Sequence, residues 1–300
     1  MMQASAIEEK KMECKRIRIR IVRHSTSIYN AAKMKETKEN PVNIFDSMYI
    51  NSELSTDGIK LCRKIRSQED GFNPTTVFST PLLRGLQTSY YLYAKTVEAI
   101  SGNTSDSDTA EEEMQAETEI SQSIPCIVHP LLTEKEWGAC DIPSETSAHC
   151  KEYAKKMAKS GVLKLDYSHL NTENPDLYFL DYIDCPDHEA IKKLIAEAAE
   201  KRSSHVEVSC AMQKEVATKN PKLANGCITT FESDESVKAR AKKFGEFLVE
   251  LNKKEQLNGD IAIVTSREFM KRFCEVWKIP TPTDFKNCDS VDFTLSELSN

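Results

Sequence analysis

The stretch GDIAIVTS, residues 259–266, decides the fold of this chain. Its central residues are continuously apolar, whereas a half-exposed strand would alternate apolar and polar side chains. A strand that is apolar on both faces is typical of a parallel sheet covered by helices on both sides. The residues that follow, 267–277, have the spacing of a helix. The sequence therefore predicts a buried parallel strand that leads directly into a helix.

Further strand patterns lie on both sides of a central region. In residues 16–24, RIRIRIVRH, isoleucine alternates with arginine, which predicts a strand. The alternate arginines indicate one polar face or an edge position. Short strands are also predicted at 75–81, 125–130 and 287–295.

Helical patterns separate these strands. Residues 54–67 read as a helix in which Ser55 or Thr56 is the N-cap and Asp57 suits the helix dipole. Two apolar stripes at helical spacing follow: Leu86, Tyr90, Tyr93 and Val97, and later Val237, Ala241, Phe244, Leu248 and Leu251. Strands that alternate with helices predict an α/β fold. We expect a three-layer sandwich with a mostly parallel central sheet, helices on both faces and a helical insertion.

The predicted domain organisation is one domain over residues 16–300 behind a flexible, charged leader at 1–15. Residues 101–123 are acidic and rich in serine, with little to bury, so we expect a disordered loop there. The pattern over 141–230 is irregular with helical stretches, and we expect a helical insertion beside the sheet.

Composition narrows the function classes. The formal net charge of -7 favours solubility and argues against nucleic acid as the main partner. No apolar run approaches the roughly 20 residues of a membrane helix, and the polar N-terminus lacks the core of a secretory signal. The 10 cysteines show no repeating spacing, so we expect reduced thiols and a cytoplasmic protein. Cys185 and His188 have a metal-like spacing, but no second pair follows, and we expect neither metal nor cofactor.

Polar residues follow several predicted strands. Ligands of open α/β sheets bind beyond the carboxyl ends of the strands, so these residues carry the most functional weight. The segments are RHSTSIYN, STPLLRGLQTS, LLTEKEWG and TSRE. A pocket formed by their meeting would contain Arg23, His24, Asn30, Arg84, Glu134, Ser266 and Arg267.

This residue set suits phosphate chemistry. Two arginines can bind the oxygens of one phosphate bidentately. A neutral histidine nitrogen can attack phosphorus, and a carboxylic acid can protonate the leaving oxygen and then activate water. Arginine also stabilises the charge that develops during transfer.

The first motifs resemble those of the histidine phosphatases, the superfamily that includes cofactor-dependent phosphoglycerate mutases. The family opens with Arg-His-Gly, followed by a serine and an asparagine. Arg23, His24, Ser27 and Asn30 match this pattern, and Ser25 replaces the glycine.

Three later blocks extend the resemblance. LSTDG at 54–58 is similar to a helix start of the family, and FSTPLLRGLQTS at 78–89 is similar to its second phosphate block. LLTEKEWG is similar to its proton-donor block. The resemblance spans about 20–295, apart from the acidic loop and much of 141–230.

The resemblance implies a role for each matching residue. His24 would be phosphorylated, and Glu134 would act as general acid and then base. Arg23, Arg84, Asn30 and Ser27 would hold the phosphoryl group. The second histidine of the family aligns with Ser266, and Arg267 stands where glycine is usual. Mutase activity is less expected than hydrolysis, because Trp137 replaces a tyrosine of the mutases and no Arg-Arg pair occurs between 138 and 200.

Each residue also has a purely structural interpretation. Asn30 would cap a turn, Glu134 would lie in a solvated loop, and Arg267 would be a surface residue at a helix start. Ser266 would be an ordinary residue at a strand end. His24 and Arg84 alone would be a structural histidine and a solvated arginine.

Three hypotheses follow from the sequence. The first is a phosphomonoesterase of low or altered activity that works through phospho-His24. The second is a pseudophosphatase that binds a phosphorylated small molecule or phosphoprotein without turnover. The third is a scaffold whose acidic loop and helical insertion bind a partner. The sequence leaves a homodimer open.

Overall fold

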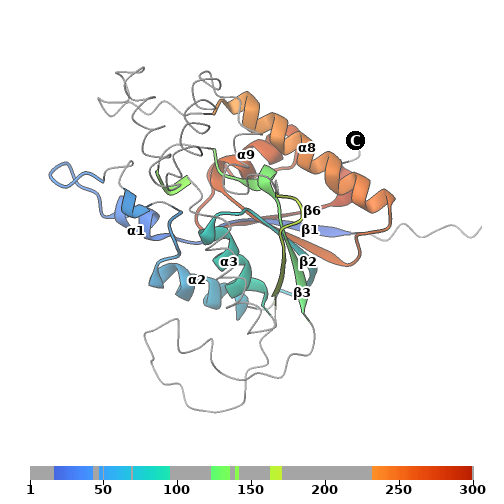
Figure 1. Ribbon diagram of the computed structural model, residues 1–300, viewed down its shortest axis with the longest axis horizontal. Coiled ribbons are helices and arrows are strands. Elements are labelled where there is room, and N and C mark those ends of the chain that lie inside the picture. Colours follow the sequence, from blue (N-terminus) through green and yellow to red (C-terminus); the bar gives the residue numbers. More distant parts are fainter. Residues whose placement is uncertain are drawn as a thin grey trace, which may run out of the picture.

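The computed structural model describes residues 17–42, 47–49, 51–68, 70–94, 123–135, 139–141, 163–170 and 232–298. In this part of the chain, a six-stranded sheet is covered by helices on both faces (Figure 1). The order of the strands is β4-β3-β2-β5-β1-β6. The strands are β1 (Arg18–Arg23), β2 (Pro74–Ser79), β3 (Ile124–Val128), β4 (Leu163–Asp166), β5 (Asp260–Thr265) and β6 (Ser290–Thr294).

The sheet is parallel except at one edge. Strand β5 pairs in parallel with both β1 and β2, and β3 and β4 continue in the same direction. Only β6, among the described strands, runs antiparallel, beside β1. The predicted α/β fold with a mostly parallel sheet is confirmed, and the apolar strand at 259–266 lies in its interior.

Two pairs of helices form the outer layers. Helices α8 (Asp234–Lys253) and α9 (Arg267–Val276) pack with Ile19, Ile21 and Ile263 in one apolar core. On the other face, α2 (Thr56–Arg66) and α3 (Leu83–Tyr93) contribute to the clusters around Val22 and Val264. The predicted stripe of α8 is buried, with Val237, Ala241, Phe244 and Leu248 fully enclosed and Leu251 half-buried.

A capping side chain explains where α2 begins, whereas no periodic apolar stripe marks α1. Helix α2 begins after Ser55, whose hydroxyl accepts a hydrogen bond from the Gly58 backbone N–H at 3.1 Å. Of the two N-caps that the sequence predicts, Ser55 is therefore the one that caps the helix. The sequence does not predict the short helix α1 (Ile28–Met34), because none of its residues is buried and they give no periodic apolar stripe.

The arginines of β1 form one polar side of an interior strand. Strand β1 lies between β5 and β6, so the alternative of an edge position is wrong. Arg18 pairs with Asp260 of β5 at 2.6 Å, and Arg20 pairs with Asp292 of β6 at 2.6 Å. Carboxylates on the neighbouring strands thus neutralise the guanidinium groups.

Some expectations fall outside the described residues. They include the leader, most of the acidic loop, Val97, Cys185 and His188. Within the range expected to hold a helical insertion, residues 163–166 form β4, which pairs with β3 at the edge of the sheet. No helix in the described part of the chain is long and apolar enough to cross a membrane.

A buried ion pair ties α8 to the loop after β3. Arg240, which is 2% exposed, binds both carboxylate oxygens of Glu232 at 2.7 Å. Its third nitrogen donates to the carbonyl oxygens of Leu131 and Thr133 at 2.6 and 3.0 Å. Arg240 therefore fixes the backbone that immediately precedes Glu134.

Replacement of Arg240 by methionine should destabilise the protein strongly. Glu232 would remain buried without its cation, and breaking such a pair costs about 3–5 kcal/mol. Urea unfolding followed by circular dichroism measures the change. The matched control is Lys242→Met on the exposed side of α8, which should stay within about 0.5 kcal/mol of wild type. A loss below about 1 kcal/mol in Arg240→Met would contradict the structural role of the pair.

Candidate active site

The carboxyl ends of three parallel strands meet through backbone hydrogen bonds. The N–H of His24, just after β1, donates to the carbonyl oxygen of Thr265 at 2.7 Å. The N–H of Thr80, after β2, donates to Val264 at 3.0 Å. The loop after β3 joins them through the hydroxyl of Thr265, which donates to Leu132 at 2.8 Å. The four sequence segments expected to form a pocket therefore lie together at the carboxyl-terminal end of the parallel strands.

His24 is held as a neutral imidazole with a defined tautomer. Its Nδ1 lies 2.7 Å from the carbonyl oxygen of Ser25, which can only accept, so Nδ1 carries the proton. Its Nε2 accepts a hydrogen bond from Nε of Arg84 at 3.1 Å. Burial, Arg84 and Arg23 lower the pKa of His24 well below its ordinary value. The Nε2 lone pair is therefore present at neutral pH, as a nucleophile requires.

Arg84 is a buried hub on the first turn of α3. The residue is 3% exposed, and all three of its guanidinium nitrogens have partners. Besides His24, it donates from NH1 to the carbonyl oxygen of Cys140 and from NH2 to Oδ1 of Asp141 at 2.7 Å. The residue expected to bind phosphate thus lies beside the expected nucleophile.

Asp141 was missed by the sequence analysis. It ends the 3₁₀ turn Ala139–Asp141 and is 3% exposed, and its carboxylate forms a buried ion pair with Arg84. A guanidinium can bind a carboxylate and a phosphate through the same N–H groups. No motif marks Asp141, because only tertiary packing brings this turn onto α3.

Arg23 and Arg267 add positive charge at the same edge. Arg23 donates from NH1 to the carbonyl oxygen of Phe285 at 2.6 Å, while its buried Nε has no hydrogen-bond partner among the described residues. Burial lowers the pKa of Arg23, and nearby Arg267 and Arg84 lower it further. Arg267 pairs with Glu268 at 3.1 Å, and its side chain is 43% exposed. It is thus close enough to act on Arg23, yet it is partly turned to the surface.

Ser266 lies at the N-cap position of α9 but does not cap the helix. It is 1% exposed, and its hydroxyl makes no capping hydrogen bond. The hydroxyl oxygen makes no hydrogen bond of acceptable geometry in the described part of the chain, but it lies near enough to the Glu134 carboxyl for hydrogen bonding between them to lower the pKa of Glu134. A buried polar group without a partner is uncommon and calls for an explanation such as an absent ligand. The N-terminus of a ten-residue helix beside it favours an anion.

Glu134 has the properties of a proton donor near neutral pH. The carboxyl is half-buried and accepts a hydrogen bond from the N–H of Lys135 at 2.9 Å. Burial, and after it the neighbouring carboxylate of Asp141, raise the pKa of Glu134 to about 7. Arg84 and Ser266 oppose this rise. A carboxyl in that range can both give and take a proton at pH 7.

Ser27 and Asn30 form the capping box of α1. The Ser27 hydroxyl accepts from the N–H of Asn30 at 3.1 Å, and the Asn30 side-chain oxygen accepts from the N–H of Ser27 at 3.4 Å. The turn-capping interpretation of Asn30 is thus confirmed. A role for either residue in phosphate binding stays a prediction.

The turn before β6 holds the backbone of Arg23 and His24 in place. The sequence does not predict these contacts. Asn287 donates from Nδ2 to the carbonyl oxygen of His24 at 3.1 Å. The backbone N–H of Cys288 donates to the carbonyl oxygen of Arg23 at 3.2 Å. The segment NCDSVDFTL by itself predicts only a strand, because nothing local indicates which loop the turn before it contacts.

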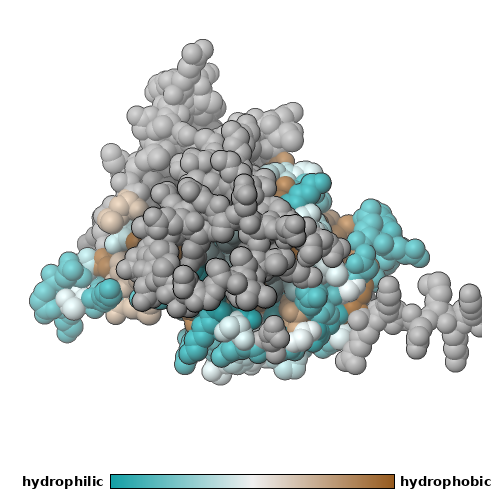
Figure 2. Space-filling view, turned by 90° about the horizontal axis from the view of Figure 1, so that it is seen from below, coloured by the Kyte–Doolittle hydropathy of each residue, from teal (hydrophilic) through white to brown (hydrophobic). Residues whose placement is uncertain are grey.

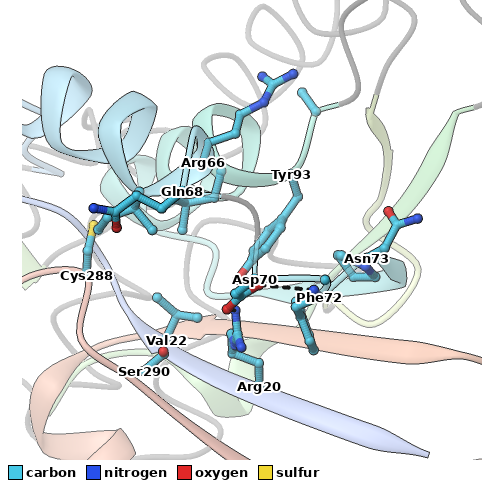
Figure 3. A pocket seen from close by; sticks show the side chains of 15 residues that line it. Arg20, Val22, Arg66, Gln68, Asp70, Phe72, Asn73, Tyr93, Cys288 and Ser290 are labelled. Atoms are coloured by element: carbon cyan, nitrogen blue, oxygen red, sulfur yellow. Dashed lines mark hydrogen bonds and ion pairs between the residues drawn. The ribbon is translucent and has the colours of Figure 1, made fainter.

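A separate pocket of about 830 Å³ lies beside Arg20 and Val22 of β1 and the beginning of β2 (Figure 3). Arg20, Asp70, Phe72 and Tyr93 are among its lining residues, and none of the expected site residues is. Arg20 is already paired with Asp70 and lies over the ring of Phe72 at 4.2 Å. This pocket therefore offers no equivalent of the charged cluster around His24. No cluster of potential metal ligands occurs among the described residues.

Replacement of Glu134 by glutamine should change the pH dependence of stability. The folded chain holds the Glu134 proton up to a pKa of about 7, against an ordinary value of 4.5. Its contribution to stability is therefore fully present below about pH 4.5 and is lost as the pH rises through 7. Between pH 5 and 8, Glu134→Gln should gain on the order of 1–3 kcal/mol relative to wild type. Urea unfolding across this range measures it, with Glu246→Gln on the exposed side of α8 as control. Parallel curves for wild type and Glu134→Gln would contradict the raised pKa.

Replacement of Asp141 by asparagine should strengthen anion binding. The amide keeps an oxygen for Arg84 but removes a buried negative charge from the neighbourhood of an incoming dianion. We expect orthovanadate to bind about tenfold more tightly. Isothermal titration calorimetry measures this affinity, and Asp292→Asn, which lies beside Arg20, is the control. Weaker binding in Asp141→Asn would show that the carboxylate instead holds Arg84 in its anion-binding position.

Comparison with known proteins finds similarity only among solved structures. No protein-family profile and no curated protein sequence matches the chain. Phosphoglycerate mutase from Bacillus anthracis is 11% identical with a TM-score of 0.41, and the match covers 95% of this chain and 96% of that one. Ecdysone phosphate phosphatase from Bombyx mori, in complex with tungstate, is 11% identical with a TM-score of 0.40, over 92% and 88% of the chains. Phosphoserine phosphatase from Entamoeba histolytica is 14% identical with a TM-score of 0.37, over 92% and 90%.

These matches are members of the histidine phosphatase superfamily, which the motifs of this chain also resemble. At these identities and TM-scores, the similarity carries no argument about activity. The chemistry of this chain is therefore argued from its own side chains.

Proposed function

We propose that this protein is a phosphomonoesterase of low or altered activity that works through a phosphorylated His24. The observation that carries the proposal is the state of His24, a neutral imidazole whose Nε2 lone pair lies 3.1 Å from Nε of Arg84. Two further buried groups lack partners among the described residues, Nε of Arg23 and the hydroxyl of Ser266. A bound phosphoryl group would supply acceptor oxygens to both.

The reaction would proceed in two steps. In the first, Nε2 of His24 attacks phosphorus, the bond from phosphorus to the ester oxygen breaks, and Glu134 protonates the leaving alkoxide. In the second, Glu134 takes a proton from water, the water oxygen attacks phosphorus, and the P–N bond breaks to release phosphate and neutral His24. A pKa of about 7 suits Glu134 for both transfers. The arginines stabilise the charge on the phosphoryl oxygens.

Two residues support a second candidate function, phosphate binding without turnover. Ser266 stands where the resemblance expects a second histidine, so one charge-stabilising donor is absent. Loss of such a donor typically slows a reaction by ~10²–10³-fold. The carboxylate of Asp141 also occupies Arg84 and must yield to a substrate phosphate. The substrate would be a phosphorylated small molecule or a phosphoprotein in either case.

Hydrolysis of an aryl phosphate separates the candidates. We expect slow turnover by the wild type that is abolished in His24→Gln, which keeps the size and polarity of the side chain. Replacement of Ser266 by histidine should raise turnover by ~10²-fold or more, because the missing donor is restored. Product release is followed across pH 4–9, and the phosphoenzyme is trapped with a ³²P-labelled ester and located by its acid lability.

A control variant and three possible results test the proposed phosphatase activity further. Ser266→Ala removes the hydroxyl without adding a donor and should not raise turnover. Orthovanadate binding without turnover in the wild type, with activity only in Ser266→His, would favour the binding function. Turnover that persists in His24→Gln would exclude the phosphohistidine mechanism. The absence of both binding and turnover in wild type would leave only the scaffold hypothesis.

A further inference from the structure

Two buried thiols lie in contact behind the His24 loop. The sulfur atoms of Cys62, on α2, and Cys288, in the turn before β6, are 3.9 Å apart. Cys62 is fully buried, and Cys288 is 7% exposed. A disulfide has an S–S bond of about 2.05 Å, so the sulfurs need to approach by about 1.9 Å to form one.

Cys288 belongs to the turn that holds the front of the proposed phosphate site. Its N–H donates to the carbonyl oxygen of Arg23 at 3.2 Å, and the N–H of Arg23 donates to Asp289 at 3.0 Å. The adjacent Asn287 binds the carbonyl oxygen of His24 at 3.1 Å. A displacement of Cys288 would therefore be passed directly to the backbone of Arg23 and His24.

Helix α2, which carries Cys62, packs against the same loop through Gly58. It follows Gly58 by one helical turn, and the carbonyl oxygen of Gly58 accepts from the Ser25 hydroxyl at 2.7 Å. A Cβ atom at position 58 would lie 2.1 Å from the carbonyl oxygen of Thr26, so only glycine allows α2 to pack this closely against the loop. The two thiols thus bridge the elements on either side of the loop that bears His24.

The backbone of Cys288 has a conformation that glycine would adopt at a lower cost in free energy. Its φ is 64°, in the left-handed region that glycine and asparagine favour. A residue with a larger side chain costs about 1–2 kcal/mol in that conformation. A cysteine here gives up stability that glycine would not.

Cys288 is also accessible to a small oxidant. It lines the pocket of about 830 Å³ beside β1, and Figure 3 shows its side chain on the wall of this pocket. It also lines a second pocket of about 530 Å³, which includes Arg23. The contact with Cys62 lowers the pKa of Cys288 and raises the pKa of Cys62. Because Cys288 lines both pockets and Cys62 lines neither of them, Cys288 is the thiol that an oxidant reaches first.

We propose that Cys62 and Cys288 are an oxidation site, and that hydrogen peroxide joins them in a reversible disulfide that weakens anion binding beside His24. The Cys288 thiolate attacks one peroxide oxygen, the O–O bond breaks, and sulfenic acid and hydroxide form. The Cys62 thiol then attacks the Cys288 sulfur, the S–O bond breaks, and water leaves with the proton of Cys62. Both sulfurs are oxidised, and the peroxide is reduced to water.

Peptide mapping of the full chain after peroxide treatment tests the modification. The protein is oxidised, its remaining thiols are alkylated after denaturation, and linked peptides are identified by mass spectrometry. We expect a Cys62–Cys288 link in the wild type, and dithiothreitol should remove it. The control variant is Cys274→Ser, which replaces a different buried cysteine, on α9, and should form the same link. In Cys62→Ser, Cys288 should stop at sulfenic acid, which dimedone traps. Both cysteines remaining alkylatable in oxidised wild type would overturn the proposal.

The effect on the site is measured as orthovanadate affinity before and after oxidation. We expect binding to weaken about tenfold or more, because small displacements of positioned groups have large effects. Dithiothreitol should restore it, and oxidised Cys62→Ser should keep full affinity. Unchanged affinity in the linked protein would overturn the coupling. This coupling rests on the proposed function, whereas the link does not: reduced wild type that binds no vanadate, yet forms the link, would refute the proposed function alone.

Discussion

The parallel pairing of β5 with β1 and β2 is the constraint on which the rest of the structure depends. Ile261, Ala262, Ile263 and Val264 are completely buried, because each face of the strand is covered by helices. The pairing fixes the register of both neighbours, Val22 opposite Val264 and Phe78 opposite Ile263. The three strands must then end at the same edge, and the residues that follow them must meet. The chemistry of the site is a consequence of that geometry.

The groups at this edge balance charge in a compact network. Arg84 binds both Nε2 of His24 and the carboxylate of Asp141, while burial, and after it the carboxylate of Asp141, raises the pKa of Glu134 to about 7. Arg84 thus already has an anionic partner within the protein. Under the proposed function, a substrate phosphate would exchange one anionic partner of Arg84 for another, which favours weak or regulated binding over tight binding.

The surface around this framework is predominantly polar. Figure 2 shows mostly hydrophilic residues among the described atoms of one face, with hydrophobic residues scattered between them. The exposed large hydrophobic residues among the described part of the chain are Ile28, Met34 and Met48. Two of these, Ile28 and Met34, lie on the short helix α1.

The sequence by itself determined five of the six described strands, the main helices and the identity of the expected nucleophile and arginines, whereas β4 lies where a helical insertion was expected. Periodicity is a local property, so the apolar run at 261–264, the stripe of α8 and the N-cap Ser55 could each be read from neighbouring residues. Tertiary structure alone decided the partners of those groups. Asp141 on Arg84, Asn287 on His24 and Cys288 beside Cys62 join residues between 57 and 263 positions apart. No local pattern specifies such contacts, because they depend on the order of strands in the sheet and on which loops that order brings together.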